Sequence, residues 1–524
     1  MIEQYSVIVV GAGHNGLVAA IYLARAGAQV LVLERRDLVG GACVTEELFP
    51  GFRVSSCSYI CHLLQQKVID DLKLTEHGFE VCQLEPYRFS PFPDGRYILT
   101  WQDHDRTIDA IRQISPMDAQ RYPEWSAFWK RAAGILHRTF LADPPTLAEV
   151  AETVRGTREE SIFEQMITGN MKDLVERYFD SPIVRALFTD AHDAGDIRAP
   201  GSIMAVAYIM CGQFTDPRFV GIPKGGMGGI TQAMARAAEA CGVEIRTGAE
   251  IEQITVDGGK VTGVLMASGE RINSDVVLSN ADPKRTFLSL VDRGALASPF
   301  VDDIQRLQTN VSCLKFHCSM RALPDFSAYL GRDFDPRMVA QVRICPSVDY
   351  FEQSWEDAKN GVPSSCPIMY IQIPSVCDAT LTPPGQHVMS VWSRYAPVTL
   401  RTGSWDEAKQ RVGEHLIDTM AQYAPNLPDI IGDWELFTPA DLERRVYLTD
   451  GNIRHLDIIS SQMLAQRPHR DLSSYRTPIE GLYLCGAGTH PGGEVTGAPG
   501  HNAAAAVLRE RGFDLHHSNV KKSR

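Results

Sequence analysis

Three glycines near the amino terminus have the spacing of a phosphate-binding turn. Gly11, Gly13 and Gly16 form a Gly-x-Gly-x-x-Gly pattern. The first glycine permits a tight turn, the second lets the backbone approach a pyrophosphate, and the third lets a helix pack against a strand. Glu34 lies 23 positions after Gly11, where a carboxylate can accept hydrogen bonds from a ribose hydroxyl. Together these residues predict a dinucleotide-binding site.

The segments around this pattern are those of a nucleotide-binding βαβ unit. The run Val7–Val10 predicts a buried parallel strand, and an alanine-rich helix follows it and stops at Gly27. Gln29–Leu33 predicts the second strand, with Glu34 at its end. The free N–H groups at the start of the helix, and the positive end of its dipole, would then face the phosphates.

The residues after the second strand indicate which dinucleotide is bound. Glu34-Arg35-Arg36 and the following Gly40-Gly41 form an acidic-basic-glycine string. Such a string is typical of the FAD-binding glutathione-reductase class. The whole stretch 6–42 resembles the amino-terminal fingerprint of the phytoene desaturase and monoamine oxidase branch of that class, which implies FAD as the cofactor.

Two later segments extend this resemblance. Residues 223–227, with the helix and strand after them, resemble the second FAD segment of these enzymes, in which an apolar strand, here containing Ile251, contacts the adenine side. Residues 486–500 resemble their carboxy-terminal flavin segment. The resemblance therefore implies four more cofactor-binding glycines: Gly486, Gly488, Gly497 and Gly500. No residue lies in a recognised flavin-attachment context, so we expect one FAD held without a covalent bond.

Details of the loops resemble one subgroup of this branch. His14 and Asn15 in the first loop, together with 488–502, are similar to desaturase-type carotenoid ketolases and to the proteins named pyridine nucleotide-disulfide oxidoreductase domain-containing protein 2. A disulfide reductase would need a redox cysteine pair and a second nucleotide fingerprint. This chain has neither, since the glycines at 225–229 precede a strand instead of following one.

Polar residues in these segments are candidates for catalysis. His490 could line the flavin face, Glu494 could act as an acid or base, and Lys224 could approach flavin N5 through a water molecule. Each has a structural alternative: loop packing for His490, solvation or backbone capping for Glu494, and turn stabilisation for Lys224. His455 and Asp457 are further candidates to reach the cavity.

The composition argues against several other classes of protein. Lys and Arg number 51 against 64 Asp and Glu, and the net charge of −13 does not suit nucleic-acid binding. No run reaches the ~18 apolar residues of a membrane span, and no signal peptide precedes the first strand. We therefore expect a cytoplasmic protein, with contact to a membrane surface as the alternative. The 12 cysteines include no Cys-x-x-Cys pair, and no spacing predicts a metal site.

The α/β pattern occurs at the beginning, middle and end of the chain. We predict an α/β fold with a discontinuous, glutathione-reductase-type FAD-binding Rossmann domain, built from three segments: 1–75, 219–285 and 475–515. An inserted α+β substrate domain with a helical cap should comprise 76–218 and 286–474. The polar segment 516–524 should be a disordered tail.

Local signals predict several boundaries within this fold. The stretches 93–95 and 257–259 predict turns. Ser115-Pro116 and the capping box of Ser404 and Glu407 predict helix starts. A strand should begin at Met338, and the last helix should start near His501.

These predictions lead to one main function and two alternatives. The main one is an FAD-dependent oxidoreductase of the phytoene-desaturase-like type, which transfers a hydride between flavin N5 and a small lipophilic substrate. The alternative among enzymes is an amine-oxidase-like activity, which an aromatic cage around the flavin would favour. The alternative outside enzymes is a flavin-binding interaction or regulatory protein with little catalysis.

Overall fold

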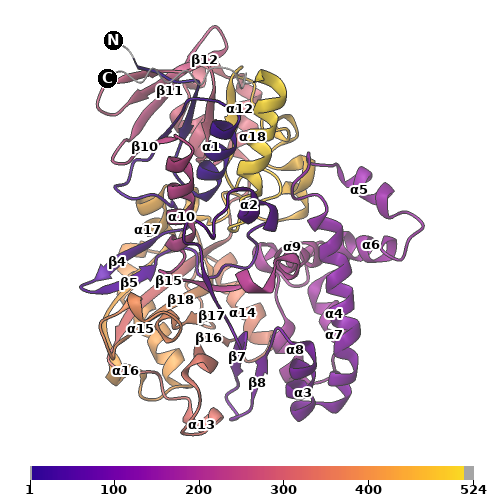
Figure 1. Ribbon diagram of the computed structural model, residues 1–524. Coiled ribbons are helices and arrows are strands. Elements are labelled where there is room, and N and C mark those ends of the chain that lie inside the picture. Colours follow the sequence, from indigo (N-terminus) through magenta and orange to yellow (C-terminus); the bar gives the residue numbers. More distant parts are fainter. Residues whose placement is uncertain (1–2, 513–524) are drawn as a thin grey trace.

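The computed structural model describes residues 3–512, and the segment 516–524 lies outside them. Its first unit is the predicted βαβ unit (Figure 1). Strands β2 (Val7–Val10) and β3 (Val30–Leu33) pair in parallel, and all their residues are buried, as continuous apolar runs require. Helix α1 (His14–Arg25) connects them and ends before Gly27, whose φ of 95° suits glycine.

The first sheet joins strands from distant parts of the chain. Its order is β10-β3-β2-β14-β20, and every pair in it is parallel. The three added strands are β10 (Glu244–Arg246), β14 (Val277–Ser279) and β20 (Leu482–Leu484). Helices α10 (Gly228–Ala240) and α18 (Ala498–Arg511) both contact α1. Because the strands are parallel, the loops after their carboxyl ends meet at one edge.

A smaller sheet lies beside the first one, near both ends of the described chain (Figure 1). Its order is β1 (Glu3–Gln4), β13 (Arg271–Asn273), β12 (Lys260–Met266) and β11 (Ile251–Asp257). The antiparallel pair β11–β12 turns at Gly258 and Gly259, which confirms the predicted turn.

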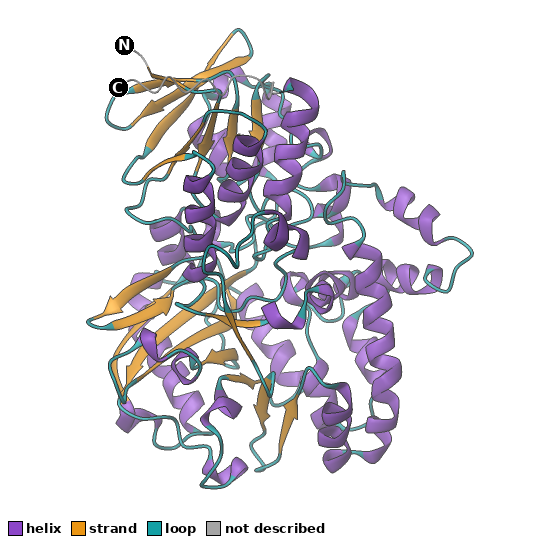
Figure 2. Ribbon diagram, in the orientation of Figure 1, coloured by secondary structure: helices purple, strands orange, loops and turns teal. Residues whose placement is uncertain are grey.

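A third, seven-stranded sheet forms the opposite half of the molecule (Figure 2). Its strands, in spatial order, are β19 (Ile431–Phe437), β15 (Ser312–Met320), β18 (His387–Ala396), β17 (Ile368–Gln372), β16 (Gln341–Ile344), β7 (Arg88–Pro91) and β8 (Tyr97–Thr100). The β7–β8 hairpin confirms the turn predicted at 93–95. Helix α15 (Trp405–Ala421) packs on this sheet and begins with the predicted capping box of Ser404 and Glu407.

A layer of helices lies along one side of the molecule, beside the seven-stranded sheet (Figure 2). It contains α3 (His104–Ile114), α4 (Pro116–His137), α5 (Leu147–Val154), α6 (Glu160–Thr168), α7 (Met171–Tyr178), α8 (Pro182–Phe188) and α9 (Ser202–Met210). The Ser115 side chain caps α4 by accepting from the Asp118 N–H, with Pro116 in the first turn. This is the start that the sequence predicts.

Short elements connect these layers. The hairpin β4 (Thr45–Phe49) and β5 (Phe52–Ser55) and the pair β6 (Val81–Gln83) and β9 (Gly221–Pro223) are antiparallel. The remaining helices are α2 (Gln66–Asp71), α11 (Pro283–Arg285), α12 (Ser298–Gln305), α13 (Ser327–Leu330), α14 (Val348–Lys359), α16 (Leu427–Ile430) and α17 (Pro439–Val446).

Two element boundaries differ from the sequence prediction. The strand predicted from Met338 begins at Gln341, because the chain before it forms a 3-10 turn. The final helix, predicted to start near His501, begins at Ala498, because Pro499 suits a first helical turn. The proposed domain boundaries stay a prediction.

Gly500 lets α18 touch α1, and this contact can be tested. A Cβ at position 500 would lie 2.1 Å from the Asn15 carbonyl oxygen, so Gly500→Ala must push the helices apart. We expect the free energy of unfolding in urea to fall by about 1–3 kcal/mol. The matched control is Gly134→Ala in α4, whose Cβ would lie 3.4 Å from Phe214 and which gains helix propensity. Equal destabilisation of both variants would contradict the close-contact role of Gly500.

Candidate functional site

A continuous cavity of about 640 Å³ lies where the first sheet, the seven-stranded sheet and the helical layer meet. Val10 and Leu33, at the carboxyl ends of β2 and β3, line one end. Tyr370 of β17 and Trp392 of β18 line it from the seven-stranded sheet, and Val206 of α9 lines it from the helical layer. The cavity is therefore bounded by segments that are far apart in the sequence.

The first glycine loop forms one wall of the cavity, at the amino-terminal end of α1. Gly11, Gly13, His14 and Asn15 all line it. Gly11 has a φ of 96°, a conformation that favours glycine. A Cβ on Gly13 would lie 2.7 Å from the side-chain nitrogen of Asn280. Only glycines leave this backbone open to the cavity, as a bound pyrophosphate requires.

Glu34 is buried behind this loop and lines the same end of the cavity. Its Oε2 accepts from the Ala12 N–H at 2.9 Å, and its Oε1 accepts from the Arg36 N–H at 3.0 Å. The carboxylate thus joins the loop after β2 to the end of β3. Each oxygen retains acceptor capacity, so Glu34 can also accept from a ribose hydroxyl.

Other predicted cofactor residues complete this end. Gly40, Gly41 and Ile251 line the cavity. A Cβ on Gly41 would lie 3.4 Å from the Gly13 Cα, so the two loops touch through their backbones. The Arg35 guanidinium also lines the cavity and lies 3.6 Å from the centre of the Tyr447 ring, a cation–π contact that holds it in place.

Five glycines expected at the cofactor do not line the cavity, and their contact with FAD stays a prediction: Gly16, Gly486, Gly488, Gly497 and Gly500. They let one segment approach another. A Cβ on Gly16 would lie 2.3 Å from the Gly11 carbonyl oxygen, and one on Gly486 would lie 2.7 Å from the Asn280 carbonyl oxygen. These glycines shape the site from behind its surface.

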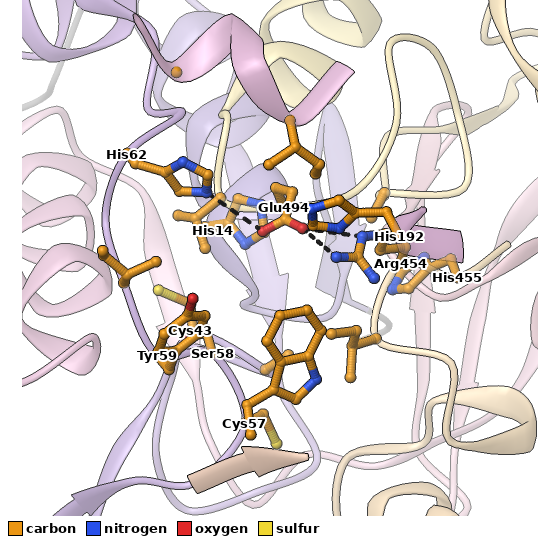
Figure 3. A pocket seen from close by; sticks show the side chains of 18 of the residues that line it. His14, Cys43, Cys57, Ser58, Tyr59, His62, His192, Arg454, His455 and Glu494 are labelled. Carbon is orange, nitrogen blue, oxygen red and sulfur yellow. Dashed lines mark hydrogen bonds and ion pairs between the residues drawn. The ribbon is translucent and has the colours of Figure 1, made fainter. Parts of the chain in front are cut away.

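Glu494 lies in the cavity wall between His62 and Arg454 (Figure 3). Arg454 Nε donates to Glu494 Oε1 at 2.9 Å, and its Nη1 donates to Asp193 at 2.7 Å. His62 Nε2 lies 3.9 Å from Glu494 Oε2. Burial by itself raises the pKa of Glu494, but Arg454 and then His62 outweigh it and lower the pKa well below its ordinary value. Glu494 is therefore ionised at neutral pH and can accept hydrogen bonds, while its role in acid–base chemistry stays a prediction.

The other two catalytic candidates do not reach the cavity. The buried His490 ring places Nε2 2.8 Å from the Thr139 carbonyl oxygen, which agrees with its structural alternative of loop packing. The exposed Lys224 pairs with Glu80 at 3.3 Å. This surface position agrees with its structural alternative, and the flavin-side role stays a prediction.

Three histidines with neutral rings line the cavity: His192, which is buried, and His14 and His455, which are partly buried. Burial lowers the pKa of His14 to about 4, and the pKa of His192 and His455 to about 3. All three rings are neutral at neutral pH. Each has one ring nitrogen without a hydrogen-bond partner among the described residues. Buried polar atoms usually find partners, so these nitrogens fit a cavity that accepts polar groups of a ligand. Asp457, the other candidate in this stretch, does not line the cavity.

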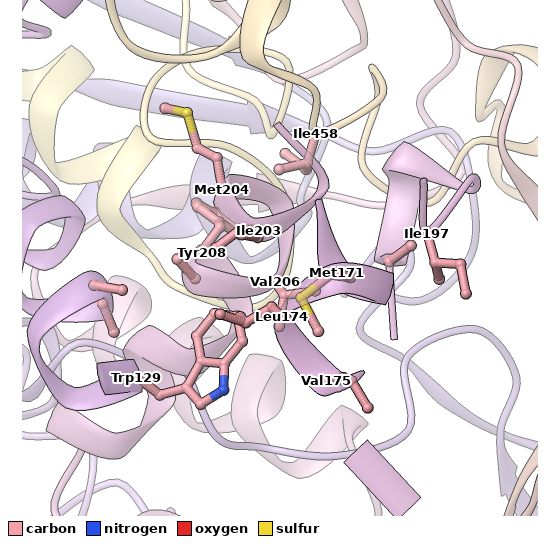
Figure 4. Packing of buried hydrophobic residues seen from close by; sticks show 14 of the residues in the cluster. Trp129, Met171, Leu174, Val175, Ile197, Ile203, Met204, Val206, Tyr208 and Ile458 are labelled. Atoms are coloured by element: carbon pink, nitrogen blue, oxygen red, sulfur yellow. The ribbon is translucent and has the colours of Figure 1, made fainter. Parts of the chain in front are cut away.

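Aromatic rings form the wall on the side of the seven-stranded sheet. The ring centroids of Trp392 lie 5.5 Å from Tyr59 and 5.1 Å from Tyr370. On the helical side, Trp129 and Val206 line the cavity and also belong to the buried cluster in Figure 4. Because this cluster packs around them, the apolar wall is a rigid part of the core.

Several residues of this site were not predicted from the sequence. His62 and Tyr59 come from a segment without regular periodicity, and Trp392 lies inside a strand where aromatics are ordinary. Arg454 stands next to His455, which was a candidate, so the sequence pointed to this stretch without identifying Arg454 itself. Only the folded chain brings these side chains to one cavity.

Comparison with known proteins agrees with this geometry. A family model described as flavin containing amine oxidoreductase matches residues 16–508. The chain belongs to the flavin-containing amine oxidoreductase family. It is 35% identical to pyridine nucleotide-disulfide oxidoreductase domain-containing protein 2 of Rattus norvegicus, over 97% of this chain and 94% of that protein. It is 27% identical to one subunit of the limonene dehydrogenase of Castellaniella defragrans, over 98% and 96% of the two chains.

The fold is also that of a solved oxidoreductase. An oxidoreductase from Methanosarcina mazei superposes with a TM-score of 0.62 at 17% identity, over 97% of this chain and 100% of that one. The family and the loop geometry together establish an FAD-dependent oxidoreductase, and the residues of the glycine-loop end fit FAD. Within residues 3–512, no helix combines the length and apolar character needed to cross a membrane.

Glu34 should matter more to FAD retention than to turnover. Charge-assisted hydrogen bonds contribute on the order of 1.5–3 kcal/mol each, so Glu34→Ala should weaken FAD binding by roughly tenfold to several hundredfold. Turnover per bound FAD should stay nearly unchanged. Titration of apo-protein with FAD measures the affinity, and Glu47→Ala, which removes an exposed carboxylate, is the matched control. Unchanged affinity in Glu34→Ala would remove this residue from the site.

Buried neutral histidines should make the protein acid-labile. The folded pKa values of His14 and His490 are about 4, and those of His192 and His455 are about 3, against about 6.5 in an unfolded chain. Below about pH 6.5 the unfolded state therefore binds protons that the folded state does not. The free energy of unfolding should fall as pH drops, by up to about 1.4 kcal/mol per pH unit for each histidine. Urea denaturation between about pH 7 and pH 5 measures this slope, and a flat profile would contradict it.

Proposed function

We propose that this FAD-dependent oxidoreductase removes a hydride from an apolar organic substrate bound in the aromatic part of the cavity. The observation that carries the proposal is the set of aromatic side chains in the lining: Tyr59, Tyr122, Trp125, Trp129, Tyr370 and Trp392. Such rings bury large apolar surfaces. Two relatives, the limonene dehydrogenase chain and a phytoene desaturase from Neurospora crassa, carry hydrocarbons in their names.

The two ends of the cavity have different tasks. We assign the glycine-loop end, with Glu34 and Arg35, to holding FAD, which when bound supplies a two-electron acceptor at N5. The aromatic end holds the substrate and excludes water from it. The apolar core behind Trp129 keeps this wall in a fixed position.

His62 is the proposed proton acceptor for the substrate. It lines the cavity, and its Nε2 faces the ionised Glu494 at 3.9 Å. A carboxylate beside an imidazole orients the ring. Arg454 keeps Glu494 ionised and, through its bond to Asp193, fixes where the carboxylate stands. His62 would accept a proton from one carbon of the substrate, while the neighbouring carbon of the substrate loses a hydride.

Amine oxidation is the second candidate. The close packing of Tyr59, Tyr370 and Trp392 is the kind of aromatic cage that favours it. A variant of putrescine oxidase shares the fold with a TM-score of 0.62 at 15% identity. Arginine side chains near these rings would repel a cationic substrate. The two candidate functions therefore predict oxidation of different classes of compound.

Anaerobic reduction of the holoenzyme decides between these functions. Purified protein is mixed with limonene or with a primary amine, and the loss of flavin absorbance is followed. We expect bleaching by the apolar compound and none by the amine. Bleaching by the amine alone would favour the second candidate, and no bleaching by a wider panel of either class would favour an interaction role.

His62 should control the rate of that bleaching. His62→Asn should slow it by roughly 100-fold or more, because general-base catalysis contributes factors of about 10²–10⁴. FAD content should not change, since Asn keeps a polar group of similar size. The control is His77→Asn, which changes a histidine that does not line the cavity. A normal rate in His62→Asn would exclude this residue as the base.

A further inference from the structure

Arg88 lines the aromatic end of the cavity and has no carboxylate partner. It is the first residue of β7 and is partly buried. Among the described residues, no Asp or Glu oxygen lies within 4.0 Å of a guanidinium nitrogen of Arg88, the limit for an ion pair. A partly buried guanidinium usually finds an anion, because burial without one is costly.

Neutral groups hold Arg88 in place without cancelling its charge. Its guanidinium lies 5.3 Å from the ring centres of both Tyr87 and Tyr370. With the Gln341 amide turned to satisfy both groups, two nitrogens of Arg88 donate to its oxygen at 3.2 and 3.3 Å. The guanidinium is therefore preorganised, and its remaining N–H groups are available to a ligand.

The charges around this end leave a positive excess. Arg343 is buried and donates to the carbonyl oxygens of Ala186, Leu187 and Thr189, none of which is charged. The nearby Asp190 pairs with Arg394 at 2.9 Å. Asp193 and Glu494 both pair with Arg454. These carboxylates thus form their ion pairs with other cations, and none forms one with Arg88 or Arg343.

The lining also presents hydrogen-bond donors without acceptors. Gln102 Nε2 and Trp392 Nε1 are buried, line the cavity and have no partner among the described residues. Gln102 lies two residues after Thr100, which pairs with Arg88 across the β7–β8 hairpin. Unsatisfied donors beside an unpaired cation call for a ligand with acceptor oxygens.

We propose that the substrate is amphipathic and carries an anionic end group, a carboxylate or a phosphate monoester, which Arg88 binds. This deepens the proposed function and rests on it, since the apolar body of the same molecule would occupy the aromatic end of the cavity. A guanidinium binds either anion through two parallel hydrogen bonds. A cationic amine at this position would be repelled.

Binding to the oxidised holoenzyme tests this class of substrate. Decanoate, decyl phosphate, decanol and decylamine are titrated by calorimetry under conditions without turnover. We expect decanoate or decyl phosphate to bind roughly tenfold or more tightly than decanol, the gain of a charge-assisted hydrogen bond. Decylamine should bind more weakly than decanol. The anion that binds more tightly identifies the end group.

Two variants locate the effect. Arg88→Gln should abolish the preference for the anion and leave decanol binding and FAD content unchanged, whereas Arg88→Lys should retain part of it. The control is Arg96→Gln on the same hairpin, because Arg96 is exposed, pairs with Asp94 and does not line the cavity. If Arg88→Gln does not fold, the anion selectivity of the unmodified protein and that of Arg88→Lys still test the proposal.

Several results would overturn the proposal. These are equal binding of decanol and both anions, tighter binding of decylamine, an anion preference that survives in Arg88→Gln, or no binding by any of the four. The outcome is independent of flavin bleaching, so failure of the proposed oxidation would be seen separately.

Discussion

The site depends on backbones that approach one another more closely than any side chain would allow. Gly16 packs on the carbonyl of Gly11, and Gly500 packs on the carbonyl of Asn15, at distances where a Cβ cannot fit. The first contact packs the start of α1 on the glycine loop, and the second places the start of α1 against α18. Together they fix the amino-terminal loop relative to the carboxy-terminal segment that carries Glu494.

Electrostatics imposes the second constraint. Arg454 is buried and stays charged because two carboxylates, Asp193 and Glu494, contact it. Burial raises the pKa of Asp193 despite this arginine, whereas the pKa of Glu494 is lowered. The cation therefore acts chiefly to keep Glu494 ionised in the cavity wall. Removing one partner from such a network leaves an uncompensated buried charge, so the three residues function as a unit.

Local signals explain what the sequence could predict. The βαβ unit, the capping box at Ser404 and the hairpin at 93–95 each depend on residues within a few positions. Contacts between residues far apart in the sequence could not be predicted from it. His62 and Arg454 stand 392 positions apart and meet at Glu494 only in the folded chain. The two alternatives for Lys224 stayed open for the same reason, since a glycine turn reveals a bend without revealing where the neighbouring side chain points.

The two ends of the cavity are built by different means, and this difference bears on how the fold is reused. At the FAD end, glycine backbones make the contacts, so a few glycines preserve the geometry while most other positions change. At the other end, side chains such as Arg88, Tyr370 and Trp392 form the surface, and each substitution changes which molecule fits. Family membership can therefore identify the cofactor, whereas the substrate has to be inferred from the charges and rings of this particular chain.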